Sequence, residues 1–494
     1  MDNEFIKKKI ENGLKFLKSK NFDKAIECFQ YIEKNKNTKL TGLLYLGITQ
    51  IEKGNNQKAI NYFNNILNID SLHEHANINI GLIHFREKKY LEALKYFELI
   101  LRINSKHLIA NLHKGIIDYN LKNFDSAYIH FEICEKIDEN IPQLYNYMGS
   151  ILFKKNSIDQ AIKYYKKSIV KNQNDSRSKY NLSRCYFSKF LYEEALELFE
   201  FRHSFTKNSK ANEVNNKFNP KQWEGEDLNN KSIIIISEQG IGDTIQYARY
   251  LFYLHETFKC KIYFYVNKKL LHLFNNCPFE AISDLNKLNH VDYCQYLMSL
   301  QKIYYNKYKK FYKNINFIHA DKESLISWKN KINKLEKPHI AISWQGNPEY
   351  SEDHLRSIPL RYFENIIKKN KYNFISLQKN IGSEQIEQNN FSKFIHDFSN
   401  EIDMADNAFD DTIHILKNID LLITSDTALA HLAGTMEINT FLLLNFNPEW
   451  RWLLQIKDKC IYSTKLKIIK QSKYNDWTSV ISELEENLNN SFIS

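Results

Sequence analysis

The first two hundred residues repeat a pattern of small and aromatic positions with a period of 34 residues. Alanine recurs at this spacing, at Ala25, Ala59, Ala93, Ala127, Ala161 and Ala195. An aromatic residue follows each alanine by four positions, at Phe29, Phe63, Phe97, Phe131, Tyr165 and Phe199, and glycine keeps the same step at Gly13, Gly47, Gly81, Gly115 and Gly149. Small residues let two helices cross closely, so the period predicts a stack of helical hairpins.

This pattern resembles the tetratricopeptide repeat, in six copies over residues 4–203. The resemblance implies an all-α solenoid whose groove binds a peptide or a partner protein, or that serves as a scaffold or dimerisation arm. The proline usual between repeats is missing, and Ser71 and Ser105 stand near its place. Asn111, Asn146 and Asn181 fall in the middle of successive hairpins, where an Asn ladder would hold peptide backbone.

The period stops in a polar stretch over residues 204–230, which predicts a linker with one anchoring residue, Trp223. Short apolar runs then alternate with helix-like stretches, which is typical of an α/β fold with parallel sheets. The runs predict strands at Ile233–Ile236, Lys261–Val266, His339–Ser343, Asn373–Leu377, Leu421–Thr424 and Thr440–Leu444. We expect two αβ domains, residues 231–335, closed by an amphipathic stretch around Trp328, and residues 336–494.

Composition narrows the class of protein. A chain of 494 residues is too long for one core, and 43% hydrophobic with 26% charged residues is typical of globular domains. The net charge of +10 suits an anionic ligand, but no basic run of the nucleic-acid-binding type is present. The seven cysteines are scattered without a Cys-x-x-Cys pair, and the sequence shows neither a signal peptide nor an apolar run long enough to span a membrane. We therefore expect a cytoplasmic protein with reduced thiols and no zinc site.

Polar residues recur where the predicted strands of the second αβ domain end. These residues are Gln345, Gln378, Lys379, Ser425 and Asp426. Ligands of parallel sheets bind outside the carboxyl ends of the strands, so the series predicts one ligand crevice. Thr427 and His431 are four residues apart and share a face of the next helix, whose N-terminus would bind a phosphate. The pattern leaves open that Asp426 only caps this helix and that His431 belongs to the core.

The first αβ domain has one comparable place, after its first predicted strand. The turn Gly240-Ile241-Gly242 would let backbone approach a ligand closely. It is not a dinucleotide fingerprint, because Ile245 stands where a third glycine is needed. Asp243 opens the next helix, either as a capping residue or as a general base at the mouth of a cleft.

Together these segments resemble family 9 glycosyltransferases, the heptosyltransferase-like group, in the version fused to tetratricopeptide repeats. The segments are EQGIGDTIQYARYL (238–251), SWQGN (343–347), DHLRSIPL (353–360), ISLQKN (375–380), AFDDT (408–412), TSDTALAHLAG (424–434) and EWRWLL (449–454). The resemblance implies a GT-B fold, in which two Rossmann-like domains face a cleft. It also implies inverting transfer from a nucleotide-sugar without a metal or cofactor. Asp410 and Asp411 precede a helix and are expected to cap it rather than to bind a metal.

The resemblance also implies roles for single residues. Asp243 would activate the acceptor, and Asp426, Thr427 and His431 would hold the donor sugar and its diphosphate. Arg356 would stabilise the leaving diphosphate. Apart from the resemblance, a departing diphosphate needs positive charge, which Lys379 would also supply. The segment that marks a lipopolysaccharide acceptor is absent, and similar fusions glycosylate proteins, so a protein or glycan acceptor is expected. The alternative is a non-catalytic repeat scaffold whose αβ half only binds a nucleotide.

Overall fold

The computed structural model of the chain describes residues 3–205, 208–350, 352–369, 371–452, 455–456, 459–460, 463 and 465–492. Contacts within the chain group it into two units, Met1–Ser178 (unit 1) and Lys179–Ser494 (unit 2). No helix among the described residues is long and apolar enough to cross a membrane.

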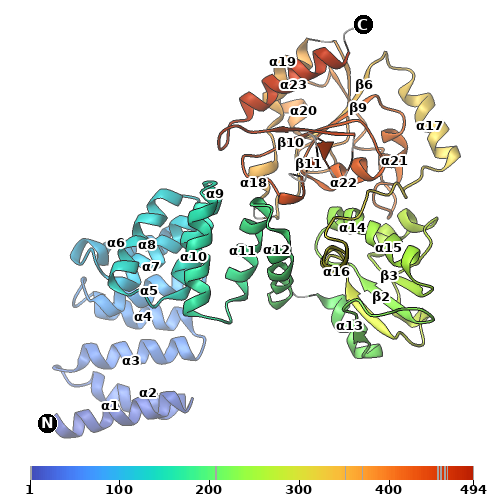
Figure 1. Cartoon of the computed structure of the whole chain (residues 1–494). Helices are drawn as coiled ribbons and strands as arrows, with labels where there is room; N and C mark the ends of the chain where they lie inside the picture. The colour runs from blue at the N-terminus through green and yellow to red at the C-terminus, as the bar shows by residue number, and fades with distance from the viewer. Residues whose placement is uncertain are drawn as a thin grey trace. The chain divides into compact units, whose positions relative to one another are not determined.

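Unit 1 is a stack of helical hairpins, as the period predicts (Figure 1). Its helices are α1 (Asn3–Lys18), α2 (Phe22–Glu33), α3 (Lys39–Glu52), α4 (Asn56–Leu67), α5 (Glu74–Arg86), α6 (Tyr90–Ile103), α7 (Leu108–Asn120), α8 (Phe124–Ile137), α9 (Pro142–Lys154) and α10 (Ile158–Lys171). The repeated glycines and aromatics meet inside each hairpin: a Cβ added to Gly115 would lie 2.7 Å from the ring of Phe131. The close crossing of the two helices therefore requires glycine at this position.

The sixth hairpin, α11 (Ser176–Ser188) and α12 (Tyr192–Phe199), packs into unit 2 instead of ending the solenoid. Phe187 stacks on Trp450 with ring centroids 3.8 Å apart and 4° between the planes. Ala195 and Phe199 belong to the same hydrophobic cluster as the αβ core. The unit boundary at Ser178 thus falls inside α11, before the predicted boundary at residue 203.

The stretch predicted as a linker, residues 204–230, holds regular structure where it is described. It contains the end of a 3₁₀ helix, η1 (Glu200–Ser204), then α13 (Ser209–Phe218) and a short strand, β1 (Lys221–Gln222). Ala211 and Val214 of α13 pack on Ile234 and Ile236 of the first sheet, which explains why this polar helix forms. Trp223 is fully buried, as expected of an anchor.

The first sheet has five parallel strands in the order β1-β5-β2-β3-β4. The strands after β1 are β2 (Ser232–Ile236), β3 (Lys261–Tyr265), β4 (Glu280–Ile282) and β5 (Tyr293–Tyr296). Helical segments alternate with them: α14 (Ile241–Tyr247), α15 (Arg249–Thr257), η2 (Lys268–Phe274), η3 (Leu285–Lys287) and α16 (Ser299–Tyr308). Ile233–Ile236 is buried throughout, as a central strand covered on both faces requires.

The second sheet has six parallel strands in the order β13-β10-β9-β6-β7-β8. The strands are β6 (His339–Ser343), β7 (Asn373–Ser376), β8 (Ile395–Asp397), β9 (Leu421–Ser425), β10 (Thr440–Leu444) and β13 (Leu466–Lys470), and β11 (Gln455–Ile456) pairs with β12 (Lys459–Cys460) separately. The helical segments are α18 (Asp353–Arg356), η4 (Leu360–Phe363), α19 (Glu364–Lys368), α20 (Gln385–Gln388), α21 (Asp410–Leu416), α22 (Ala428–Thr435), η5 (Trp450–Trp452) and α23 (Trp477–Ser491). The chain runs outward from β6 to one edge and then from β9 to the other. This is a doubly wound sheet with its switch point between β6 and β9.

Helix α17 (Lys322–Ile332), predicted to close the first αβ domain, packs against α21 beside the second sheet. Trp328 Nε1 donates a hydrogen bond of 2.8 Å to Asp411 Oδ1, which fixes this packing. Asp410 and Asp411 lie in the first turn of α21, but the prediction that they cap it is wrong: Phe409 is the N-cap residue, and the Asp403 carboxylate accepts the hydrogen bonds of the Asp411 and Thr412 amides.

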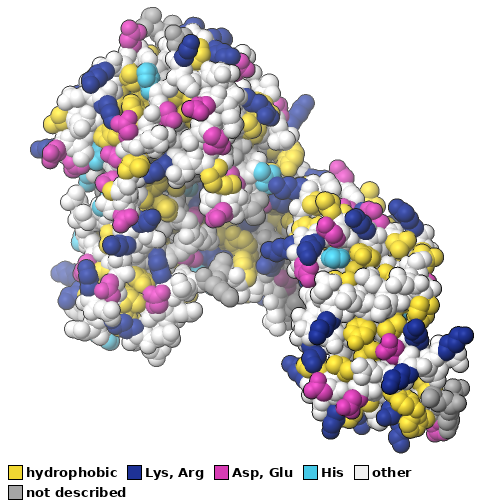
Figure 2. All heavy atoms as spheres, turned by 180° about the vertical axis from the view of Figure 1, so that it is seen from behind, with side chains coloured by type: hydrophobic (Ala, Val, Ile, Leu, Met, Phe, Trp, Pro, Cys, Tyr) yellow, Lys and Arg dark blue, Asp and Glu magenta, His cyan; other side chains and the backbone are white. Residues whose placement is uncertain are grey.

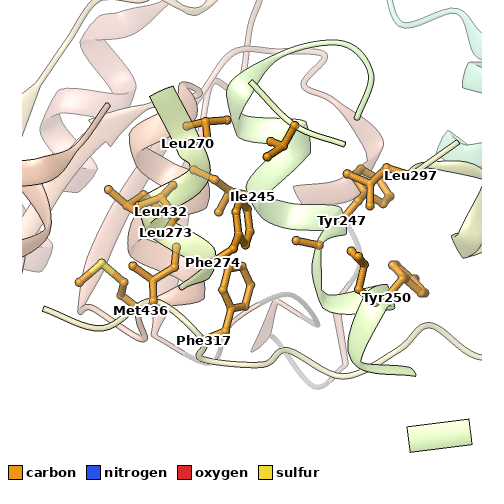
Figure 3. Packing of buried hydrophobic residues seen from close by; sticks show 14 of the residues in the cluster. Ile245, Tyr247, Tyr250, Leu270, Leu273, Phe274, Leu297, Phe317, Leu432 and Met436 are labelled. Carbon is orange, nitrogen blue, oxygen red and sulfur yellow. The ribbon is translucent and has the colours of Figure 1, made fainter. Parts of the chain in front are cut away.

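One hydrophobic cluster joins the elements of the two sheets. Ile245 of α14 and Phe274 of η2 belong to the same cluster as Leu432 of α22 and Met436, the C-cap residue of that helix (Figure 3). The cluster holds α14 against α22. On the face of the molecule shown in Figure 2, the described Lys and Arg side chains are interspersed with Asp and Glu.

Candidate functional site

The N-terminal turn of α14, from the first sheet, lies directly against α22, from the second. A Cβ added to Gly242 would lie 2.5 Å from His431 Cδ2 and 3.2 Å from Ala428 Cα. Only glycine therefore permits this approach. The approach places Gly240, Gly242 and the next residue, Asp243, beside the helix predicted to bind a phosphate.

Asp243 is half-buried and forms an ion pair that the sequence did not predict. Its Oδ2 accepts a hydrogen bond of 3.0 Å from the Gly240 amide, which is a capping contact. Its Oδ1 accepts a hydrogen bond from Arg451 Nη1, which also donates to Gln246 Oε1 at 3.0 Å. Burial acts to raise the pKa of the Asp243 carboxyl, but the charge and hydrogen bond of Arg451 hold that pKa below its usual value. The carboxylate is thus both a cap and the partner of a cation.

Arg451 lies in η5, which follows the carboxyl end of β10. Its neighbour Trp452 is fully buried and stacks on His431 with ring centroids 4.5 Å apart. The sequence signal for this element is the segment EWRWLL, an arginine between two tryptophans, of which residues 453 and 454 lie outside the described residues. Its contact with α14, 208 positions away, is a tertiary feature.

His431 and Asp426 have strongly shifted pKa values. Burial, with a smaller contribution from the cation Arg451, lowers the pKa of His431 to about 3. This histidine is therefore neutral at pH 7, so it offers a polar N–H but not the positive charge expected at a leaving diphosphate. Burial raises the pKa of the Asp426 carboxyl to about 6, although Arg451 and Arg356 act to lower it.

Ser425, Asp426 and Thr427 lie at the carboxyl end of β9, beside the switch point. Thr427, and not Asp426, is the N-cap residue of α22, so the capping alternative for Asp426 does not hold. The hydroxyls Ser425 Oγ and Thr427 Oγ1 are both buried and have no hydrogen-bond partner within the described residues. Buried hydroxyls are normally paired, so two such groups at one helix N-terminus are well suited to an incoming ligand.

Arg356 in α18 lies near the same point. Its Nε donates a hydrogen bond of 2.9 Å to Asp353 Oδ1, and its guanidinium lies 4.7 Å from the centre of the Tyr350 ring. The charge of Arg356 acts on the pKa values of both Asp426 and His431. The structure therefore brings Asp243, Arg356, Asp426, Thr427 and His431 together.

Three other predicted donor residues form hydrogen bonds with groups of the protein itself. Gln378 Oε1 accepts hydrogen bonds from the Trp344 and Gln345 amides at 3.1 and 3.0 Å. Gln345 Oε1 accepts one of 2.8 Å from Gln385 Nε2. The Lys379 ammonium donates to the carbonyl of Asp403, so it is not directed at the α14–α22 contact.

The switch point of the first sheet, between β2 and β5, holds an ion pair. Glu238 follows β2 and binds Arg202 of η1 through two hydrogen bonds, of 2.9 and 2.8 Å. Arg202 is 1% exposed and also donates to Glu200 Oε1 at 2.6 Å and to Ser299 Oγ at 2.8 Å. The chain itself thus fills the place where a parallel sheet usually binds its ligand.

The described residues contain no group of three or more His, Cys, Asp or Glu side chains placed to hold a metal ion. In the repeats, Asn111 Nδ2 donates to the carbonyls of Ser105 and His107, and Asn146 Nδ2 donates to Ser178 Oγ. These two amides of the predicted ladder therefore serve the hairpins themselves.

Comparisons with known proteins agree with the repeat period. Profiles of the tetratricopeptide repeat match residues 44–107 and residues 142–169. The N-terminal helices are tetratricopeptide repeats. No curated protein matches the chain.

Several solved structures align with part of the chain. A structure of MamA is 22% identical over 33% of this chain and 96% of its own, with a TM-score of 0.30. YrrB, described as a tetratricopeptide-repeat protein with an unusual peptide-binding site, is 21% identical over 36% and 91%, with a TM-score of 0.32. PilF of Pseudomonas aeruginosa is 16% identical over 43% and 98%, with a TM-score of 0.38.

Proposed function

We propose that unit 2 is an inverting, metal-independent glycosyltransferase of GT-B type, which moves a sugar from a nucleotide-sugar to a protein or glycan acceptor. The repeats would recruit the acceptor or a partner protein. The observation that carries this proposal is the position of Asp243. This carboxylate, on α14 beside the first sheet, lies near α22 of the second αβ domain. Arg451, Arg356 and two buried hydroxyls without a partner among the described residues gather at the same place.

The proposed chemistry needs one base and a place for the leaving group. The Asp243 carboxylate would take the proton of the acceptor hydroxyl while that oxygen forms a bond to the anomeric carbon of the donor. The bond between the anomeric carbon and the diphosphate breaks on the opposite face, and its electron pair leaves with the diphosphate. The configuration at the anomeric carbon is therefore inverted.

The leaving diphosphate would be stabilised by fixed charges and dipoles. Arg451 and Arg356 supply the positive charge. The N-terminus of α22 and the hydroxyls of Ser425 and Thr427 supply hydrogen-bond donors. Neutral His431 would contribute its N–H alone. These groups would perform without a metal the role that a cation has in other transferases, and the donor is a substrate rather than a cofactor.

The test of this proposal separates binding from transfer. Calorimetry with UDP, ADP and GDP in EDTA, followed by transfer or hydrolysis assays with their sugars, identifies the donor class. We expect Asp243→Asn to bind the nucleoside diphosphate at least as well as wild type and to lose transfer by at least about 100-fold. Asp397→Asn, the same change at the carboxyl end of β8, is the matched control and should keep its turnover.

The second candidate function is a repeat scaffold whose αβ unit binds a nucleotide without catalysis. One observation favours it: Asp243 is paired with Arg451, and the pKa of its carboxyl is low for a base. Binding of a nucleoside diphosphate without turnover of any nucleotide-sugar would support this function. An absolute requirement for magnesium or manganese would instead contradict the metal-free mechanism.

A further inference from the structure

The ion pair between Arg451 and Asp243 opposes the role of Asp243 as a base. A carboxylate held by a guanidinium is a weak proton acceptor, because protonation would break a charge-assisted contact. If the pair persisted during the reaction, Asp243 would be poorly suited to deprotonate a hydroxyl. The same pair places an arginine at the site where the proposed function puts a diphosphate.

The Arg451 guanidinium also has hydrogen-bonding capacity left. Nη1 serves Asp243 and Gln246, but Nε is buried and has no hydrogen-bond partner within the described residues. Asp426, at the N-terminus of α22, is close enough for the charge of Arg451 to act on the pKa of its carboxyl. Arginine binds phosphate oxygens through parallel hydrogen bonds, so this guanidinium has a second class of partner within reach.

The remaining groups around Asp243 do not replace Arg451. On α14 the neighbours are Gln246 and Tyr247, and on α22 the neighbour is His431, which is neutral at pH 7. Asp426, which precedes α22, is within reach of the charge of Arg451. The other charges that act on this cluster are Arg249 of α15, Arg356 of α18 and Glu449 beside η5. Among the residues that the structure describes, Arg451 is the one cation that forms an ion pair with the Asp243 carboxylate.

We propose that Arg451 is a positioning residue that exchanges partners. Arg451 pairs with Asp243 in this structure. When the diphosphate of the donor binds at the N-terminus of α22, Arg451 turns to the phosphate oxygens and releases Asp243. This inference rests on the proposed function. A diphosphate carries more charge than one carboxylate, so it competes effectively for the guanidinium. Asp243 therefore becomes an effective base only after the donor has bound. An acceptor that binds before the donor contacts a carboxylate that is still paired with Arg451.

The first test is structural and needs no turnover. A crystal structure of the full-length protein with inorganic pyrophosphate, the group common to all nucleoside diphosphate donors, should show an Arg451 nitrogen on a pyrophosphate oxygen and Asp243 unpaired. Pyrophosphate bound at α22 with the Arg451–Asp243 pair intact would overturn the exchange and leave the proposed function standing. If neither pyrophosphate nor any nucleoside diphosphate binds, the proposed function itself fails, and the exchange fails with it.

The second test compares two pH profiles. The acid limb of kcat/KM for the donor reports the free enzyme, and the acid limb of kcat reports the enzyme with substrates bound. In wild type we expect the kcat limb to lie about 1–3 pH units above the kcat/KM limb, because a nearby opposite charge shifts a carboxyl pKa by that amount. In Arg451→Gln both limbs should lie at the higher pH, and Arg451→Lys should restore the difference in part. Coincident limbs in wild type would contradict the exchange, and the pyrophosphate structure decides the question if the variants do not fold.

Discussion

Gly242 on α14 and His431 on α22 are 189 positions apart in the chain, yet His431 Cδ2 lies 2.5 Å from the position that a Cβ of residue 242 would take. The contact therefore sets how closely α14 approaches α22. It also fixes the distance between the proposed donor site and the proposed base, Asp243, which is the next residue after Gly242.

The first prediction concerns this contact. Gly242→Ala forces the imidazole of His431 or the whole of α14 to move, because the new methyl group overlaps a buried ring. Overpacking of this kind costs about 1–3 kcal/mol in the free energy of unfolding. Urea unfolding followed by tryptophan fluorescence measures it, because all six tryptophans lie between residues 223 and 477.

Gly240→Ala is the matched control in the same turn. Its φ of −84° suits any residue, and the nearest atom to its Cβ would be Asp243 Oδ2 at 3.2 Å. We expect a smaller loss of stability than for Gly242→Ala. Equal stability of Gly242→Ala and wild type would show that α14 does not depend on this approach.

The second prediction uses the raised pKa of Asp426. The pKa of the Asp426 carboxyl is about 6 in the folded protein, above its usual value of 3.8. Its contribution to the free energy of unfolding is therefore present below pH 3.8 and is lost as the pH rises through about 6. Asp426→Asn removes this dependence of the free energy of unfolding on pH. After allowance for partial exposure, we expect the variant to be more stable than wild type by about 1–2 kcal/mol at pH 7.5 and not at pH 4.

His431 titrates with the opposite sign. Its pKa of about 3 lies below 6.5, so its contribution is present above pH 6.5 and is lost as the pH falls. This contribution is common to wild type and Asp426→Asn, so the difference in urea midpoint between the two proteins isolates Asp426. A difference that does not change between pH 4 and pH 7.5 would contradict the assignment.

The third prediction concerns Arg202. Arg202→Met leaves the buried Glu238 carboxylate without its cation, which typically costs about 3–5 kcal/mol of stability. The double change Arg202→Met with Glu238→Met should recover a large part of this loss. Lys53→Met, which removes the ion pair between Lys53 and the exposed Asp23, is the surface control and should cost less than about 1 kcal/mol. An Arg202→Met protein as stable as the control would show that the pair does not hold η1 to the first sheet.

The fourth prediction concerns truncation. A fragment that begins near residue 174 keeps α11 and α12, whose Phe187, Ala195 and Phe199 belong to the core of unit 2, and should unfold cooperatively. A fragment that begins near residue 220 lacks these side chains and should be unfolded or aggregated. Circular dichroism and tryptophan fluorescence distinguish the two outcomes.

The longer fragment also tests the repeats. If the solenoid delivers the acceptor, this fragment should hydrolyse the nucleotide-sugar at the wild-type rate but glycosylate the native acceptor slowly. Equal rates of glycosylation by the fragment and the full chain would remove the delivery role.

The sequence predicted those parts of the fold that depend on local pattern. Strands β6 and β10 begin and end where their apolar runs do, because both are central strands buried on both faces. The hairpins follow from the period. Strand β1 was missed because two exposed residues at a sheet edge carry no apolar signal, and α13 because its packing depends on two small apolar residues.

The sequence also predicted the part of the candidate site that depends on where the strands end. Residues that follow strands, such as Ser425 and Thr427, are placed by the topology of a parallel sheet. Whether such a residue faces a ligand or the backbone depends on its neighbours, and Gln378 and Lys379 turn to backbone groups. The partner of Asp243 comes from an element that no local pattern connects to α14.

The sixth hairpin has a consequence for how such a chain can evolve. Repeat arrays lengthen and shorten by the gain or loss of whole repeats, because each repeat contacts only its neighbours. Here the last hairpin shares its core with the αβ unit through Phe187 and Trp450. Whole repeats can therefore be inserted or deleted before residue 176 without disturbing the αβ unit, whereas the hairpin from α11 to α12 must be inherited with that unit as one piece.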